Sequence, residues 1–101
     1  MVCLGREAVV LELLGDLPAA LGLQVVGSPV VAAIEGGLAG MVILAESHCA
    51  VHTSIAEGAA FVDVFSCRRP VDVHGAEAVV ARVLGGTVQA RLVRRGPTGG
   101  A

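Results

Sequence analysis

Aromatic side chains are scarce in this chain of 101 residues, which has no Trp, no Tyr and only two Phe, Phe61 and Phe65. A site that has to stack against a flat ring therefore has few candidates. Lysine is absent as well, and the densest basic cluster is a short run of arginines at positions 91, 94 and 95. The formal net charge is −2. Because nucleic-acid-binding proteins present broad basic surfaces, nucleic acid is not an expected partner.

The chain also has no uninterrupted apolar run long enough to cross a bilayer. Its longest weakly polar stretch, residues 26–45, contains Pro29, Glu35 and four glycines. These residues fit a turn between strands better than a helix that faces lipid. The N-terminus reaches Arg6 and Glu7 without an apolar signal segment, so we expect no membrane association and a cytoplasmic location.

Cysteine is present but in a pattern that predicts neither a disulfide framework nor a metal site. The three cysteines, Cys3, Cys49 and Cys67, are odd in number and form no C-x-x-C pair. Both features are typical of free thiols in a reducing compartment.

Hydrophobic residues make up 54% of the chain, and the mean hydropathy is +0.79. This composition excludes intrinsic disorder, and the length allows one hydrophobic core. We therefore expect a single domain over residues 1–95 and a loose tail rich in Gly over 96–101. A protomer this small and this apolar cannot hide all of its apolar surface, so we expect a homo-oligomer, most simply a homodimer.

The first third of the chain predicts two strands and a short helix. Residues 6–14 are rich in branched apolar side chains and read as a strand that ends at Gly15. Asp16 and Pro18 resemble a helix start, and Gly22 follows so soon that the helix is expected to be stunted. Residues 23–34 predict a strand that is bulged or at a sheet edge, because a Gly-Ser-Pro sequence interrupts them.

The remainder predicts more strands and one long helix. Residues 40–45, 48–53 and 59–66 have the composition and alternation of strands. Apolar residues at helical spacing predict a helix over 72–84, with Asp72 as N-cap and Gly85 as the stop, and residues 87–94 predict a closing strand. The expected fold class is α+β: a two-layer sandwich of a mainly antiparallel sheet with one long and one stunted helix on one face.

Three residue types that can carry chemistry fall on or beside neighbouring predicted strands: Ser47, His52 and Cys67. By themselves they are compatible with acyl transfer, and equally with a serine in a turn, a hydrogen-bonded histidine and an inert cysteine. A serine or cysteine hydrolase is the weaker interpretation, because no Asp stands at a recognisable spacing from His52 to orient it.

Three segments together resemble bacterial S-adenosylmethionine decarboxylases: GLAGMVILAESH at 37–48, His-Thr at 52–53 and DVFSC at 63–67. The resemblance runs in order through most of residues 4–95. It implies a proenzyme that cleaves itself between Glu46 and Ser47, giving a β chain of residues 1–46 and an α chain of residues 47–101.

The resemblance also implies the role of each residue. The Ser47 hydroxyl attacks the carbonyl of Glu46, and elimination leaves a covalent pyruvoyl group, the cofactor, in place of the serine. His52 is the base that removes the serine α-proton during processing. The pyruvoyl group then binds the amine of a small-molecule substrate as a Schiff base and withdraws electrons as carbon dioxide leaves. Cys67 is the proton donor that follows.

Some positions depart from the family pattern. Ala39 stands where the family usually carries a serine that assists processing, and the family has a long helix after the position of Asp16. The aromatic residues that grip adenine in the family are replaced by apolar residues around Val30 and by Ser54-Ile55-Ala56. The spacing of four between Phe61 and Phe65 suggests core packing for both.

These departures favour a substrate other than S-adenosylmethionine. Glu57 lies near the expected nucleoside position and is a candidate partner for a cationic side chain. We therefore expect decarboxylation of L-arginine or L-ornithine in polyamine synthesis. The alternatives are S-adenosylmethionine decarboxylation for spermidine synthesis, and a non-catalytic oligomeric homologue. His74, Cys3 and Cys49 have no assigned role.

Overall fold

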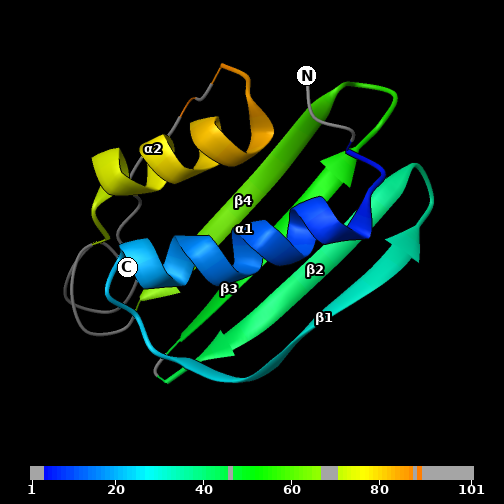
Figure 1. The fold of residues 1–101 in the computed structure, drawn as a ribbon. Coiled ribbons are helices and arrows are strands. Elements are labelled where there is room, and N and C mark those ends of the chain that lie inside the picture. Colours follow the sequence, from blue (N-terminus) through cyan, green and yellow to red (C-terminus); the bar gives the residue numbers. More distant parts are fainter. Residues whose placement is uncertain (1–3, 46, 67–70, 88, 90–101) are drawn as a thin grey trace, which may run out of the picture.

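The computed structural model describes residues 4–45, 47–66, 71–87 and 89, and these form a four-stranded antiparallel sheet with two helices packed on it. The elements follow the order α1 (Glu7–Ala20), β1 (Val25–Ile34), β2 (Gly37–Leu44), β3 (Ser47–Ser54), β4 (Ala59–Ser66) and α2 (Val73–Leu84). The strands lie in sequence order, each paired with the next, as Figure 1 shows. The expected α+β sandwich is confirmed.

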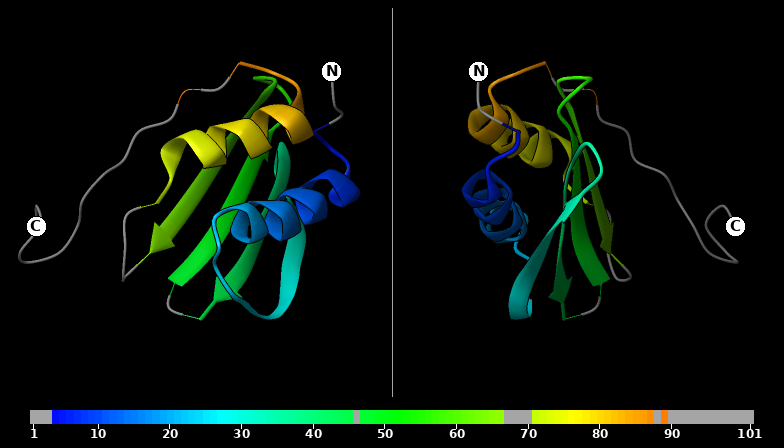
Figure 2. Two further views of the ribbon diagram at one scale, coloured as in Figure 1. Left: turned by 60° about the vertical axis from the view of Figure 1, so that its left-hand side comes forward. Right: turned by 90° about the vertical axis from the view of Figure 1, so that its right-hand side faces the viewer.

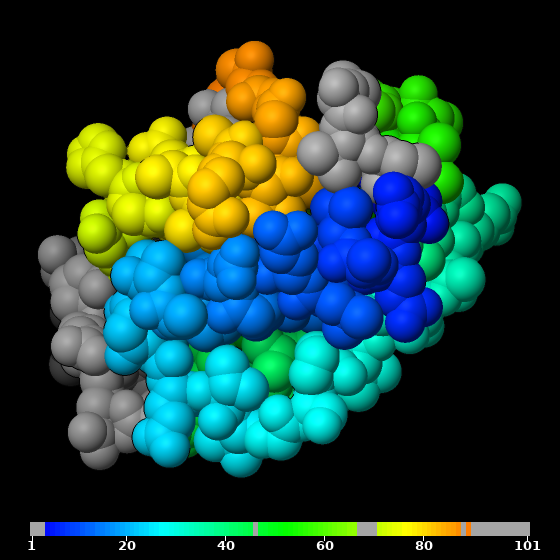
Figure 3. Space-filling model, in the orientation of Figure 1, coloured from blue at the N-terminus to red at the C-terminus, as the bar shows by residue number. Residues whose placement is uncertain are grey.

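The two helices lie on the same face of the sheet. Seen from the side, α1 and α2 are on one side of the four strands, and no described helix is on the other (Figure 2). The space-filling view of the helical side shows α1 and α2 in contact along their length, with little of the central strands visible (Figure 3). The sheet therefore has one covered face and one face that no described element covers, which we call the open face.

Helix α1 corrects two predictions from the sequence. Residues 6–14 are not a strand, and the helix around Asp16 is not stunted, because Glu7–Ala20 form one helix of 14 residues. The buried side chains Val10, Leu13, Leu14 and Leu17 recur at helical spacing and form the α1 part of the core. The prediction of a strand rested on Val9, Val10 and Gly15. Burial of the apolar stripe outweighs the weak local preferences of these residues.

Close approach of α1 to the sheet depends on Gly40 in β2. A Cβ atom at this position would lie 2.6 Å from Val10 and 3.0 Å from Leu14. Only a residue without a side chain lets the helix sit this deep on β2. The helix therefore packs closely on β2, against the centre of the covered face.

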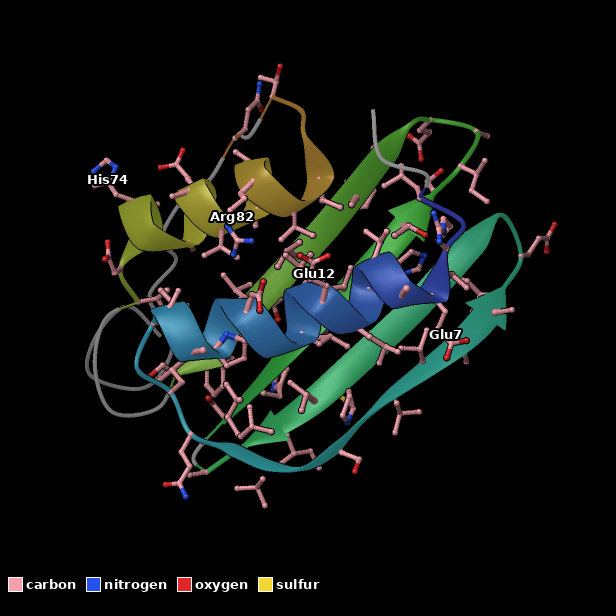
Figure 4. The ribbon with its side chains drawn as sticks, viewed as in Figure 1. Glu7, Glu12, His74 and Arg82 are labelled. Atoms are coloured by element: carbon pink, nitrogen blue, oxygen red, sulfur yellow. The ribbon has the colours of Figure 1, made fainter. Side chains whose placement is uncertain are left out.

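Helix α2 agrees with its prediction at both ends. The side chain of Asp72 accepts a hydrogen bond of 3.1 Å from the Gly75 backbone N–H, and Gly85 ends the helix in the left-handed conformation. Arg82 points from α2 toward α1, where its guanidinium lies 3.1 Å from Asp16 and 3.9 Å from Glu12 (Figure 4). These exposed ion pairs fix the contact between the helices at modest energy, about 0 to 1 kcal/mol each.

The predicted edge strand with a bulge is also confirmed. β1 is at the sheet edge, and its pairing with β2 is irregular between Val26 and Val30, where Gly27 has a φ of 80°. The predicted closing strand over 87–94 falls largely on residues outside the described ones, as does the tail over 96–101.

Candidate active site

The candidate cleavage point lies at the hairpin that joins β2 to β3. Leu44 and Ser47 are the last cross-strand pair, so only Ala45 and Glu46 separate the two strands. The Ala45 backbone N–H donates a hydrogen bond of 2.9 Å to the Gln24 carbonyl, which holds one side of the hairpin against β1. Glu46 itself is outside the described residues. Ser47 is thus the first residue of a central strand, directly after a tight turn.

The side chain of Ser47 belongs to the covered face of the sheet. It alternates in phase with Cys49, Val51 and Thr53, all of which are buried beneath the helices. Its partners across the ladders are Leu44 on β2 and Ser66 on β4. Ser47 is half-buried.

His52 lies on the same strand but on the opposite, open face. It is five positions after Ser47 in the sequence, which corresponds to about 16 Å along an extended strand. An odd separation also places the two side chains on different faces. Within one protomer, the structure does not bring the proposed processing base to the serine.

Ala39 is the direct cross-strand partner of His52, and both are on the open face. The register is fixed beside them by Thr53, whose buried hydroxyl accepts a hydrogen bond of 2.9 Å from the Leu38 backbone N–H. Directly paired side chains have Cβ atoms about 4.5–5.5 Å apart. Position 39 therefore belongs with His52 and lies at the far end of the hairpin from Ser47.

A second polar group on the open face was not assigned a role from the sequence. The Nε2 atom of His48 lies 3.5 Å from a carboxylate oxygen of Asp63, and the His48 ring stacks on Phe65 with centroids 5.8 Å apart. Strand alternation could have indicated this cluster, because His48 and Phe65 are direct cross-strand partners and Asp63 shares their face. These contacts orient the side chain of His48, the residue that follows Ser47.

The open face also corrects the prediction for the aromatic residues. Phe61 and Phe65 do share a face, as their spacing predicts, but it is the open face and not the core. Phe61 is 59% exposed and is paired with His52, whereas Phe65 is half-buried against His48. Exposed apolar side chains continue around them, at Val26, Val30, Met41 and Ile43.

Glu57 lies in the turn between β3 and β4, at the opposite end of the sheet from Ser47. This turn neighbours the β1–β2 turn, where the Gly36 carbonyl accepts a hydrogen bond of 2.9 Å from the Ile55 backbone N–H. Glu57 is exposed. The structure therefore does not place it beside the serine of its own chain.

The remaining candidates contribute little to this site. Cys67 is outside the described residues, as is Cys3. Cys49 is buried in the core, and burial, with a smaller contribution from the charge of Asp63, raises the pKa of its thiol from 9.0 to about 12. It is therefore protonated and unreactive at neutral pH. His74 is almost fully exposed on α2, 3.5 Å from Glu77 (Figure 4).

Two kinds of feature are absent from the part of the chain that the structure describes. Among residues 4–45, 47–66, 71–87 and 89, no cluster of His, Cys, Asp and Glu is arranged to hold a metal ion. No helix in this part of the chain combines the length and apolar character that a membrane span requires.

Fold and site together define a small α+β protein whose candidate cleavage point is a serine at the start of a central strand. The model of the S-adenosylmethionine decarboxylase family matches residues 2–96, and the chain belongs to this family. The family uses a covalent pyruvoyl group that a serine supplies through self-cleavage. No solved structure matches significantly.

Curated relatives carry the name S-adenosylmethionine decarboxylase proenzyme. The protein from Symbiobacterium thermophilum is 36% identical over 86 residues, which are 84% of this chain and 65% of the relative. That from Carboxydothermus hydrogenoformans is 39% identical over 61 residues, 59% of this chain and 48% of the relative. That from Pseudomonas aeruginosa is 51% identical over 43 residues, 43% of this chain and 26% of the relative. The chain thus spans less than two thirds of the length of these relatives.

Proposed function

We propose that this chain is a self-processing decarboxylase that cleaves itself before Ser47 and acts on S-adenosylmethionine. The observation that carries the proposal is the position of Ser47, directly after a tight hairpin turn, in a chain that the family model matches over residues 2–96. The names of the curated relatives favour S-adenosylmethionine over L-arginine or L-ornithine as substrate. The role in polyamine synthesis and the cytoplasmic location stay predictions.

The pairing of the strands keeps the two fragments together after cleavage at the hairpin. Attack by the Ser47 hydroxyl on the Glu46 carbonyl exchanges the peptide bond for an ester. Loss of the serine α-hydrogen then breaks the bond between Cβ and the ester oxygen, so the Glu46 carboxylate leaves and the fragments separate. Water replaces the serine nitrogen, which leaves as ammonia, and supplies the carbonyl oxygen of the pyruvoyl group. After the cut, β2 stays paired with β1, and β3 with β4. The β2–β3 ladder from Ala39–His52 to Leu44–Ser47 also remains. Both fragments therefore stay in one sheet.

The residues present fit a pyruvoyl group at position 47. When formed, this group supplies a carbonyl that binds the substrate amine and withdraws electrons from the carbon that loses carbon dioxide. His48, held by Asp63 and stacked on Phe65, fixes the backbone beside that position. Cys67 is proposed to donate a proton to the substrate carbon, and His52 to remove the α-proton during processing.

His52 can serve Ser47 only if a second copy supplies it. A twofold axis exchanges equivalent residues between two copies. If the axis passes near the middle of β3, between Cys49 and Ala50, His52 of one copy lies opposite Ser47 of the other.

The open face supports a homodimer of this kind. Val30 is 68% exposed, Ile43 is 58% exposed and Val26 is 50% exposed, and all three lie on it. Contiguous apolar surface of this kind marks an interaction site in a soluble protein. A second copy placed there buries this surface and completes two equivalent sites at once.

L-Arginine or L-ornithine remains the second candidate substrate, because Ser54, Ile55 and Ala56 carry no aromatic ring and Glu57 is an exposed carboxylate beside them. In a face-to-face dimer, Glu57 and His52 of one copy both approach the serine of the other from the same end of β3. A carboxylate at this position would pair with a guanidinium or ammonium group. Glu57→Gln would then raise KM for the basic amino acid.

Release of carbon dioxide from carboxyl-labelled S-adenosylmethionine, L-arginine and L-ornithine, each at equal concentration, tests the proposal. Purified protein, whose cleavage is first checked by intact mass, is expected to release it fastest from S-adenosylmethionine. Glu57→Gln should leave that rate unchanged. Faster release from a basic amino acid, together with loss of that rate in Glu57→Gln, would establish the second candidate. Cleaved protein with no activity on any of the three substrates would refute both.

A further inference from the structure

The two aromatic side chains of the chain have different surroundings. Phe65 is stacked against His48 and is half-buried. Phe61 is 59% exposed, and no ring among the described residues stacks on it. A ring this exposed on a strand offers a large apolar area to a binding partner.

The side chains around Phe61 leave the face of its ring accessible. Its direct cross-strand partner is His52, and the next residues on the same face of β3 are Ala50 and Ser54. Ala59 and Asp63 flank it along β4. Apart from His52 and Asp63, these neighbours are small. A flat ligand could therefore lie on the Phe61 ring, with the His52 imidazole beside it.

Phe61 also belongs to the part of the sheet that the proposed site uses. Directly paired side chains have Cβ atoms about 4.5–5.5 Å apart, so any arrangement that brings His52 to the serine of a second copy brings Phe61 there too. S-adenosylmethionine has a purine ring at the end opposite its amino and carboxyl groups. Purines stack on aromatic side chains with a useful binding energy.

We propose that Phe61 is a specificity-determining residue that holds the adenine ring of S-adenosylmethionine by stacking. The inference rests on the proposed function, and it assigns the nucleoside end of the substrate to the β4 side of His52. It also explains how a chain without aromatic residues at positions 54–56 keeps a nucleoside substrate. A small basic amino acid has no ring and gains nothing from Phe61.

The test compares variants that differ in the ring alone. Phe61→Leu removes the ring and keeps an apolar side chain, whereas Phe61→Trp keeps an aromatic face. Met41→Leu is the matched control, because it changes an exposed apolar side chain on the same face that has no ring. For each protein, self-cleavage is followed by intact mass and oligomeric state by light scattering. Binding of 5′-methylthioadenosine is measured by calorimetry, and kcat and KM for S-adenosylmethionine are measured by release of carbon dioxide.

Phe61→Leu should raise Kd for 5′-methylthioadenosine and KM for S-adenosylmethionine by about tenfold or more. Cleavage and oligomeric state should not change. Phe61→Trp and Met41→Leu should retain both constants within about twofold of the parent protein. Retention of both constants in Phe61→Leu would overturn the inference, and so would a loss that accompanies dissociation of the oligomer, which would assign Phe61 to packing between copies.

These outcomes separate the inference from the proposed function. If the parent protein decarboxylates S-adenosylmethionine but Phe61→Leu has the same KM, only the role of Phe61 is wrong. If the parent protein binds 5′-methylthioadenosine through Phe61 but releases no carbon dioxide, the adenine site stands and the decarboxylase proposal is wrong. A parent protein that does not bind the nucleoside at all contradicts the role of Phe61 directly.

Discussion

Ser47 and His52 share strand β3, but their side chains project from opposite faces of the sheet, about 16 Å apart along the strand. A base must reach its proton within hydrogen-bond distance, directly or through one water. Neither strand flexing nor a side-chain rotation spans this gap. The separation makes the composition of the site, one chain or two, an experimental question.

Mixed dimers should answer that question. Ser47→Ala and His52→Ala are each expected to stay uncut when expressed alone. When the two are co-expressed, the His52→Ala chain keeps its serine and receives His52 from its partner, so it should be cut. Because random pairing puts about half of the chains in mixed dimers, about half of the His52→Ala chains should be processed by the criterion of intact mass. No cleavage in the mixture would show that the base acts within one chain or that His52 is not the base.

The cleavage point itself is predicted at the bond before Ser47. Parent protein should give fragments of 46 and 101 − 46 = 55 residues, and the longer fragment should have a blocked N-terminus that borohydride reduces. Ser47→Ala should remain full length because it lacks the attacking hydroxyl. Ser66→Ala is the matched control, since Ser66 faces Ser47 across β4 on the same sheet face, and it should be cut normally. A single uncut mass for the parent protein after long incubation would support a non-catalytic homologue.

Ala39→Ser should speed self-cleavage. The new hydroxyl would stand directly across from His52, where it can donate to or accept from the imidazole and assist proton transfer. We expect the cleavage rate to rise about tenfold or more. Ala50→Ser adds the same hydroxyl to the same face of the sheet, on β3 opposite Met41, and it should leave the rate unchanged. Equal effects of the two variants would indicate a general change in polarity of the open face.

Cys67→Ala should separate processing from turnover. The thiol is proposed to act only after carbon dioxide has left, so the variant should be cut like the parent protein. Its kcat should fall by about 10²-fold or more, the contribution typical of a positioned proton donor. Cys49→Ala, measured by the same mass and turnover assays, should keep its kcat because that thiol lies in the core. An uncut Cys67→Ala chain would place the thiol in processing instead.

Cys49 should make stability fall at alkaline pH. Burial raises the pKa of this thiol from 9.0 to about 12 in the folded chain, so the folded state keeps the proton where the unfolded state loses it. The full contribution of the Cys49 thiol to the free energy of unfolding is present below pH 9. It is lost as the pH rises from 9 toward 12. By about pH 10.5 the free energy of unfolding should drop by on the order of 1 to 2 kcal/mol.

Urea unfolding of parent protein and Cys49→Val at neutral and alkaline pH measures this effect. In Cys49→Val the free energy of unfolding should not show this part of the decline at alkaline pH, whatever its value at neutral pH. Identical pH slopes for the two proteins would mean that water reaches the thiol in the folded chain. Thiol-reactive reagents give a second readout, since Cys49 of the folded parent should stay unmodified at neutral pH.

The strands around the candidate site could be predicted from the sequence because their signals are local. Alternation through residues 48–53 and 59–66, and the turn residues that separate these strands, predict β3 and β4 within one or two residues. Asp72 and Gly85 mark α2 in the same way. The prediction for the α1 segment was wrong because Val9 and Val10 favour a strand locally and Gly15 indicated its end, whereas the stripe from Val10 to Leu17 gains more by burial as a helix.

The sequence by itself determined the family, the hairpin that carries Ser47 and the residue types available for chemistry, since each depends on neighbours along the chain. Only the tertiary structure decided which face of the sheet the helices cover. The covered face takes Ser47, because α1 packs against Gly40 and buries that side of the sheet. The open face takes His52, Phe61 and the His48–Asp63 pair. Period-two alternation separates the faces, but which face is covered depends on where the helices dock, and that is set by packing across the whole chain.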